Sequence, residues 1–173
     1  LNEICQLDVA DIQDQDGLLC FHVRPDPLIG GRKRLKTKTS ERIVPGHPEL
    51  LSFGFASYVE SRRRQGSIKL FPELRPSAAG YFSDAFSKWF RRFLASAGAE
   101  APRTCFHSFR HCFRDALRRG RIEHEVGLVH GGWSIGGNGE GVSAPYGAGF
   151  STPRLFEAIS AVTYPDHDLD HLR

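Results

Sequence analysis

The sequence predicts a mainly α-helical domain that contains a small antiparallel β-sheet. Apolar residues recur at helical spacing in several stretches, of which the longest covers about 79–97. Between residues 18 and 45, by contrast, runs of β-forming residues are separated by Pro and Gly. The chain has 173 residues and 40% hydrophobic composition, which is enough for one core. We therefore expect a single domain over 1–173.

The amino-terminal part is expected to hold the end of a helix, the sheet and a further helix. The first residues with helical spacing are Leu1, Ile4 and Cys5, and this helix should end near Asp8 and Asp11. Strands are expected at 18–23 and within RLKTKTSERIVP at 34–45. Pro48 suits a first helical turn, and apolar spacing predicts a helix that ends near Gly66.

The carboxy-terminal half is expected to be helical apart from one loop. The helix at 79–97 has a broad apolar face that predicts a core position: Phe82, Phe86, Trp89, Phe90, Phe93 and Leu94. His107 opens a third helix whose inward face is Phe109, Cys112, Phe113, Ala116 and Leu117, with Gly120 as its C-cap. A short helix at 122–130 follows. Eight glycines between Gly131 and Gly149 predict an irregular loop, and Thr152-Pro153 predicts the N-cap and first turn of a last helix.

The distribution of charge favours a nucleic-acid partner. The net charge is only +3, but Lys and Arg gather in four clumps, at 32–42, 62–64, 91–92 and 114–121. Clumped cations can neutralise successive phosphates of a nucleic-acid backbone, whereas scattered ones mainly solvate a surface.

Cysteine usage and hydropathy bear on the compartment. The four cysteines form no C-x-x-C pair and are too sparse for a disulfide scaffold, which fits a reducing cytoplasm. Cys105 and Cys112 are expected to be small core residues. No apolar run approaches a membrane span and no leader peptide is recognisable, so we expect a cytoplasmic protein without a membrane partner.

Four short motifs contain residues suited to chemistry, and they follow one another along the chain. LKTKTSERIVP contains Lys36, and HSFRH contains His107 and Arg110 in H-x-x-R spacing. Gly131-Gly132-Trp133 begins soon afterwards, with Trp133 placed 26 positions after His107. Tyr146 then lies in SAPYGAG. In type and order these motifs resemble the catalytic domain of tyrosine recombinases of the phage-integrase type.

Cleavage of a phosphodiester by an alcohol explains these residue types. It needs a nucleophile, a base, an acid for the leaving alkoxide and cations around the phosphoryl oxygens. The resemblance implies that Tyr146 is the nucleophile and forms a 3′-phosphotyrosyl link. His107 suits the base, the planar guanidinium of Arg110 suits the non-bridging oxygens, and Lys36 suits the general acid. Trp133 could donate its indole N–H to the phosphate.

Several residue assignments have alternatives. Lys38 lies two residues after Lys36, on the same face of a strand, and could be the acid instead. His130 competes with Trp133, and Tyr164 is the next candidate after Tyr146 as the nucleophile. His107 and His111 have the i, i+4 spacing of zinc ligands, but Ser108 replaces the Glu of the H-E-x-x-H motif, so no metal is expected.

The resemblance also implies the partners and the extent of the protein. It implies double-stranded DNA as substrate, a homotetramer on two DNA sites and no cofactor. LNEICQL resembles the segment after the family's first catalytic Arg, so an Arg is expected directly before Leu1 and the 173-residue chain alone is expected to be inactive. A type IB topoisomerase-like enzyme and a catalytically silent DNA-binding relative are the alternatives. The last helix could pack on its own core or on a neighbouring subunit.

Overall fold

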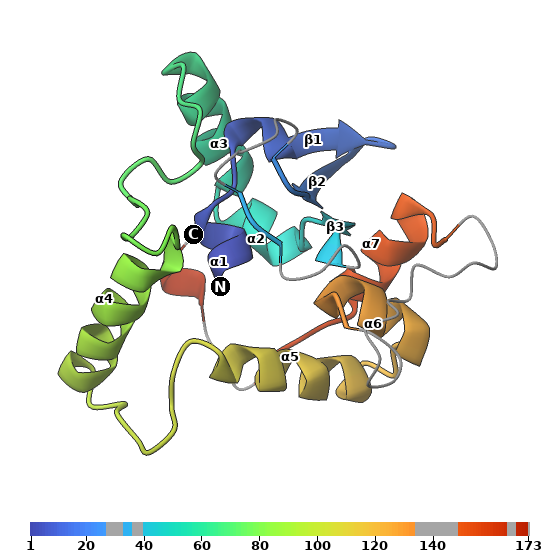
Figure 1. Ribbon diagram of the computed structural model, residues 1–173. Coiled ribbons are helices and arrows are strands. Elements are labelled where there is room, and N and C mark those ends of the chain that lie inside the picture. The colour runs from blue at the N-terminus through green and yellow to red at the C-terminus, as the bar shows by residue number, and fades with distance from the viewer. Residues whose placement is uncertain (27–32, 36–39, 134–148, 166–168, 173) are drawn as a thin grey trace.

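The computed structural model describes residues 1–26, 33–35, 40–133, 149–165 and 169–172. Over these residues the chain is mainly helical with one small three-stranded antiparallel sheet, as predicted (Figure 1). The elements are α1 (Asn2–Cys5), η1 (Val9–Asp11), β1 (Ile12–Gln15), β2 (Leu18–Val23), β3 (Arg42–Pro45), α2 (Pro48–Ser52), α3 (Phe55–Arg64), α4 (Ser83–Ser96), α5 (Ser108–Arg119), α6 (His124–Gly131), α7 (Thr152–Ser160) and η3 (Asp170–Leu172).

The sheet contains one strand that the sequence did not predict. Its order is β1-β2-β3, and β1 pairs with β2 through a hairpin in register Ile12 to Phe21. Asp16 and Gly17 form the two-residue turn, and both have positive φ angles of 56° and 76°. Asp-Gly is a strong hairpin signal. The strand before it was nevertheless not predicted, because its sequence, IQDQ, contains a single apolar residue.

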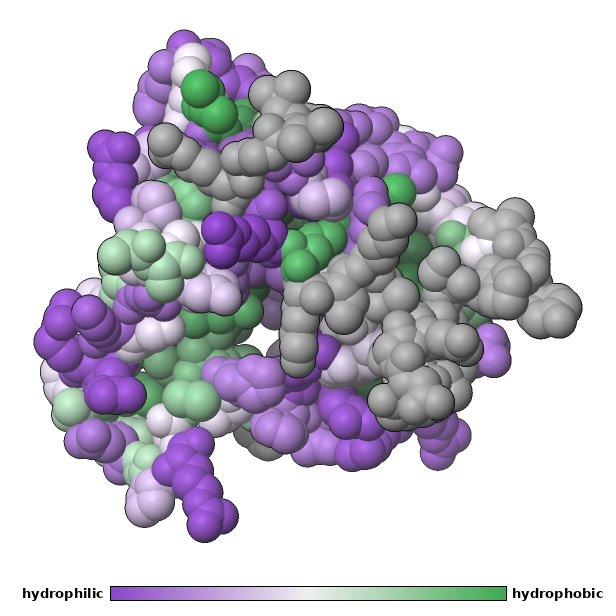
Figure 2. Space-filling view, viewed as in Figure 1, coloured by the Kyte–Doolittle hydropathy of each residue, from purple (hydrophilic) through white to green (hydrophobic). Residues whose placement is uncertain are grey.

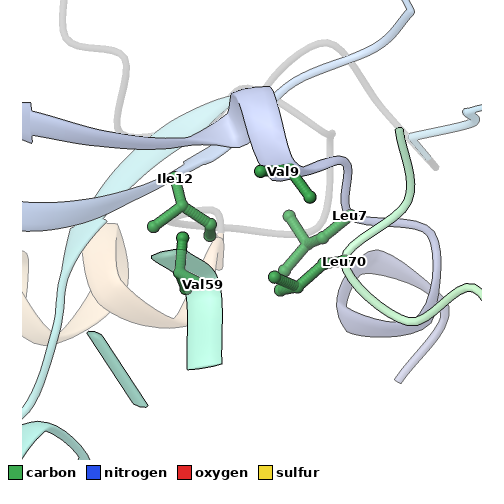
Figure 3. Close-up of a cluster of buried hydrophobic side chains, with 5 residues drawn as sticks. All are labelled: Leu7, Val9, Ile12, Val59 and Leu70. Atoms are coloured by element: carbon green, nitrogen blue, oxygen red, sulfur yellow. The ribbon is translucent and has the colours of Figure 1, made fainter. Parts of the chain in front are cut away.

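The best-defined core lies under the sheet. Its buried side chains come from the segment before β1, from the first residue of β1, from α3 and from the segment after α3: Leu7, Val9, Ile12, Val59 and Leu70 (Figure 3). Backbone hydrogen bonds from Val9 to Ile68 and from Leu70 to Leu7 hold the two outer segments together. The sequence predicted one helix from Pro48 to near Gly66, but Gly54, at φ 82°, separates α2 from α3.

A buried ion cluster sits beside this core. Lys33 is buried, and its ammonium contacts the carboxylates of Asp8 at 2.9 Å and Asp11 at 2.8 Å. Burial alone would raise the pKa of Asp11, but hydrogen bonds from Lys33, from the backbone of Asp8 and from Arg24 outweigh it and lower that pKa. Lys33 therefore anchors the chain just before residues 36–39.

Of the six apolar residues predicted to form a core face at 79–97, Phe82, the N-cap residue of α4, is buried, but the other five are not. None of the residues of α4 is buried, and Trp89 and Phe93 are 48% and 49% exposed. The rings pack mainly on one another and on Phe106 and Phe109 from the chain before and within α5. Hydrophobic surface consequently remains visible on the side of α4 that faces the middle of the molecule (Figure 2).

The predicted inward face of α5 is buried only in its second half. Ala116 and Leu117 are buried, whereas Phe109 is 55% exposed and Cys112 is exposed. Cys105 is exposed as well, so the prediction that Cys105 and Cys112 are core residues is wrong. The helix ends at Arg119, and Gly120 is its C-cap as predicted.

The last two helices complete the domain near β3. Ser151, not Thr152, is the N-cap of α7, because its hydroxyl accepts a hydrogen bond from the backbone N–H of Arg154. Leu155, Ile159 and Val162 are buried within the chain's own core, where α7 contacts α6 and β3. The apolar stripe of the last helix thus packs on the chain's own core, and Phe156 within that stripe is only partly buried. Among the described residues, no helix is both long and apolar enough to cross a lipid bilayer.

Candidate functional site

A cleft of about 790 Å³ opens between α1, β3, α5 and the end of α6. Its polar lining residues include Arg34, Arg42, His107, Arg110, His130 and Trp133. Aromatic side chains line another part of it: Tyr81, Phe106, Phe109 and Phe113. The cleft therefore combines guanidinium groups with apolar surface, a combination suited to a ligand with both phosphates and rings.

The start of α5 supplies two of the predicted residues. His107 is the N-cap residue, and Arg110 follows one turn later, so that both side chains lie on the face that borders the cleft. His107 is exposed and Arg110 is half-buried. Both of these predicted residues are thus accessible from one cavity.

Among the described residues, no carboxylate lies within ion-pair distance of the guanidinium of Arg110. Burial lowers its pKa, Glu3 raises it, and the neighbouring Arg42 and Arg114 lower it further. A partly desolvated cation of this kind gains from binding an anion, because the anion replaces the water that burial has removed.

Trp133 lies against Arg110. The guanidinium carbon of Arg110 is 4.7 Å from the centre of the Trp133 ring, and that of Arg114 is 5.1 Å away. The ring folds back over Gly131, where a Cβ atom would come within 2.2 Å of it. Gly132, at φ 58°, then forms the left-handed C-cap of α6. The two glycines are what allow Trp133 to reach the cleft.

His130 lines the same cleft but is engaged elsewhere. Its side chain is buried, and its Nε2 atom lies 3.1 Å from the carbonyl oxygen of Leu155 in α7. Burial lowers the pKa of His130 to about 4, so the ring is neutral at pH 7. Its Nδ1 atom is buried and has no hydrogen-bond partner among the described residues. His130 is therefore hydrogen-bonded to α7, whereas Trp133 contacts the guanidinium of Arg110.

Sequence reasoning missed two residues of the cleft. Arg42, at the start of β3, forms an ion pair with Glu3 of α1 at 2.8 Å and donates hydrogen bonds to two backbone carbonyls. The sequence indicated Arg42 only as one member of the basic clump at 32–42, and a single Glu in a short helix is an ordinary surface residue. Arg42 lies inside the lysine motif, which was the available signal.

The remaining predicted residues lie outside the described residues. These are Lys36 and its alternative Lys38, which fall in 36–39, and Tyr146, which falls in 134–148. Leu35 and Trp133, the described residues directly before these two segments, line the cleft.

The described residues offer no evident metal centre. The rings of His107 and His111 lie 5.9 Å apart, edge to face, and no third ligand joins them: within the described ranges no group of three His, Cys, Asp or Glu is placed to hold a metal ion. Comparison of the chain with protein-family models, with curated proteins and with solved structures gave no match.

Proposed function

We propose that this chain is the catalytic domain of a tyrosine recombinase of the phage-integrase type, which breaks and rejoins DNA through a 3′-phosphotyrosyl intermediate. One observation carries the proposal. His107 and Arg110 come from one motif and Trp133 from another, more than twenty residues later, yet all three line one cleft together with Arg34 and Arg42. Surface residues that merely resembled the motifs would have no reason to converge.

In the proposed reaction each group of the cleft has one task. The scissile phosphate binds at Arg110, whose guanidinium has no carboxylate partner among the described residues, and the indole N–H of Trp133 is a further donor to it. His107, exposed at the start of α5, accepts the phenolic proton of Tyr146 as that oxygen attacks phosphorus. Lys36 donates a proton to the leaving 5′ oxygen. The energy of the broken bond is retained in the phosphotyrosine, so rejoining needs no nucleotide.

The natural protein is proposed to act as a homotetramer on two double-stranded DNA sites, as the resemblance implies. The basic lining of the cleft supports the choice of DNA as partner.

A covalent-trapping experiment tests the proposal. The natural protein is incubated with suicide DNA substrates, in which a nick near the cleavage position lets the leaving strand diffuse away, and the DNA-protein adduct is measured. We expect an adduct with the wild type and with Tyr164→Phe, and none with Tyr146→Phe, because only the last variant loses the nucleophilic oxygen. An adduct formed by Tyr146→Phe at the wild-type rate would contradict the proposal.

DNA affinity separates the enzyme from a silent relative. Each phosphate that the protein neutralises releases counterions, so binding should weaken steeply between roughly 50 and 200 mM salt. Salt-sensitive binding without any adduct would favour the catalytically silent DNA-binding relative. Binding that does not change over this range would contradict the electrostatic argument, in which the clumped Lys and Arg neutralise DNA phosphates.

A further inference from the structure

Arg42 joins three separate parts of the cleft. Its Nη2 atom contacts the carboxylate of Glu3 in α1 at 2.8 Å, and its Nη1 atom donates to the carbonyl of Ser40 at 2.7 Å. Its Nε atom donates to the carbonyl of His130, in the last turn of α6, at 3.2 Å. All three nitrogens of the guanidinium are therefore already bonded. The side chain is 13% exposed.

These contacts differ from those of Arg110, which lines the same cleft. Arg110 has no carboxylate partner in the described part of the chain, whereas Arg42 is bonded to a carboxylate and to two carbonyls. An anion that entered the cleft could bind the guanidinium of Arg110 without competing with a carboxylate in the described part of the chain. Three of the five N–H donors of Arg42 are already bonded to the protein, which leaves fewer donors for an anion. Arg42 is thus better suited to hold protein segments than to hold substrate.

The segment that Arg42 holds is the one that positions Trp133. A Cβ atom at Gly132 would come within 2.8 Å of Nη1 of Arg42, so the guanidinium packs directly on the left-handed cap of α6. Trp133 is the next residue, and its ring lies 4.7 Å from the guanidinium carbon of Arg110. On its other side Arg42 bonds Ser40, which directly follows residues 36–39.

We propose that Arg42 is a positioning residue, which acts as a clamp that holds the C-cap of α6 against α1 and the start of β3. By doing so it fixes the positions of Trp133 and Arg110 in the cleft. Its planar fork is needed for this, because three acceptors in different directions cannot be reached by the single ammonium of Lys. The structural part of the proposal is independent of the activity. Its consequence for catalysis rests on the proposed function.

The indole N–H resonances of the 173-residue chain test the structural part. The chain has two tryptophans, so a ¹H–¹⁵N spectrum should give two indole signals, which Trp89→Phe assigns. In Arg42→Ala and in Arg42→Lys the Trp133 signal should shift while the Trp89 signal, from the exposed face of α4, stays in place.

Arg62→Ala is the matched control. Arg62 forms an ion pair with Glu73 at 2.8 Å and is 20% exposed, but it lies in α3, outside the lining of the cleft. Its loss should leave both indole signals unchanged. A Trp133 signal that coincides with that of the wild type in both Arg42 variants would overturn the proposal. If neither variant folds, Glu3→Gln, which weakens only the ion pair, takes their place with the same two outcomes.

Kinetics in the natural protein test the catalytic part. At saturating suicide DNA, Arg42→Lys should form the adduct about 10²-fold more slowly, as expected for displaced catalytic groups. Its Kd for DNA should stay within about twofold of the wild type, since Arg42 itself is not proposed to contact a phosphate and Arg110 is displaced, not removed. A residue with a merely structural role would lower the amount of folded protein and leave this rate unchanged, and that result would overturn the catalytic part.

The two proposals can fail separately. A shifted Trp133 signal together with a wild-type protein that forms no adduct would refute the recombinase activity and leave the clamp standing. A normal wild-type adduct together with an unshifted Trp133 signal would refute the clamp alone.

Discussion

The two halves of α5 have the same amphipathic pattern but different surroundings. In the first half, Phe109 and Cys112 are exposed, and the helix borders the cleft through His107 and Arg110. In the second half, Ala116 and Leu117 are buried in a cluster with Ile159 of α7 and Val162. The spacing of apolar residues is the same, so the difference lies in what covers each half.

This difference explains how one helix can serve both the core and the cleft. The buried half fixes the helix against α7, and the first half then projects into a cavity that packing has left open. The centroids of Phe90 in α4 and of Phe106 lie 6.0 Å and 5.3 Å from that of Phe109, and the Phe109 side chain nevertheless remains 55% exposed. The exposed residues are therefore held by a rigid support, as a binding site requires.

The largest expected effect comes from the cleft half. In the natural protein, Arg110→Ala should lower the rate of adduct formation at saturating DNA by about 10²–10³, because it removes a preorganised cation from the transition state. Arg118→Ala is the matched change in the second half, where Arg118 is paired with Asp115 on the exposed face. Its rate should stay within about twofold of the wild type. Equal losses would mean that general basicity, not the cleft, sets the rate.

The stability of the folded chain should show the opposite order. Leu117→Ala should lower the free energy of unfolding by about 2–5 kcal/mol, because it empties a buried site. Phe109→Ala should lower it by only about 1 kcal/mol, since the ring is more than half exposed. Urea denaturation of the 173-residue chain measures both. A loss for Phe109→Ala as large as that for Leu117→Ala would indicate that another surface covers the rings of α4 and α5 in solution.

The sequence predicted the elements of the fold better than their burial. The ends of α5, α6 and α7 agree within a few residues because caps, glycines and helical periodicity are local signals. The apolar face of α4 was correctly located but wrongly assigned to the core, since periodicity shows which face is apolar and not what lies opposite. β1 was missed for a related reason: its stability comes from pairing with β2, not from its own residues.

The candidate site was predictable where one motif contained the chemistry. His107 and Arg110 were found because H-x-x-R spacing places both side chains on one face of one helix. Arg42 and Glu3 were missed because their roles depend on segments 39 residues apart that meet only in the folded chain. A contact between residues this far apart in the chain cannot be predicted from a local sequence pattern.

The contrast between cleft and core also separates the two histidines that line the cavity. His107 is exposed at the start of α5, whereas His130 is buried against α7 with its pKa lowered to about 4. The unfolded chain binds a proton at His130 near pH 6.5, and the folded chain does so only near pH 4, so acid favours unfolding. The contribution of neutral His130 to the free energy of unfolding is therefore complete above about pH 6.5 and is lost as the pH falls toward 4.

Urea denaturation at two pH values measures this loss. Burial of His130 should make the free energy of unfolding about 2 kcal/mol lower at pH 5 than at pH 7. His130→Gln keeps a donor for the carbonyl of Leu155 but cannot titrate. The free energy of unfolding of this variant should therefore fall by about 2 kcal/mol less than that of the wild type between pH 7 and pH 5. His22, whose pKa burial also lowers, is present in both proteins and cancels. An identical pH dependence in wild type and variant would show that His130 does not remain neutral in the folded chain.

The smallest expected effect concerns Cys112, in the exposed half of α5. Its thiol is exposed and contributes little packing, so Cys112→Ser should change the free energy of unfolding by no more than about 0.5 kcal/mol.

Cys20 in β2 is the matched contrast: it is fully buried, and burial raises the pKa of its thiol. Cys20→Ser places a hydroxyl in that site and should cost about 1–3 kcal/mol unless the hydroxyl finds a hydrogen-bond partner. Labelling with a thiol reagent gives an independent measurement on the unmodified chain, since Cys112 should react in the folded state and Cys20 only after denaturant is added. Protection of Cys112 in the folded chain would show that the first half of α5 is covered in solution, and the difference between the two halves of the helix would then disappear.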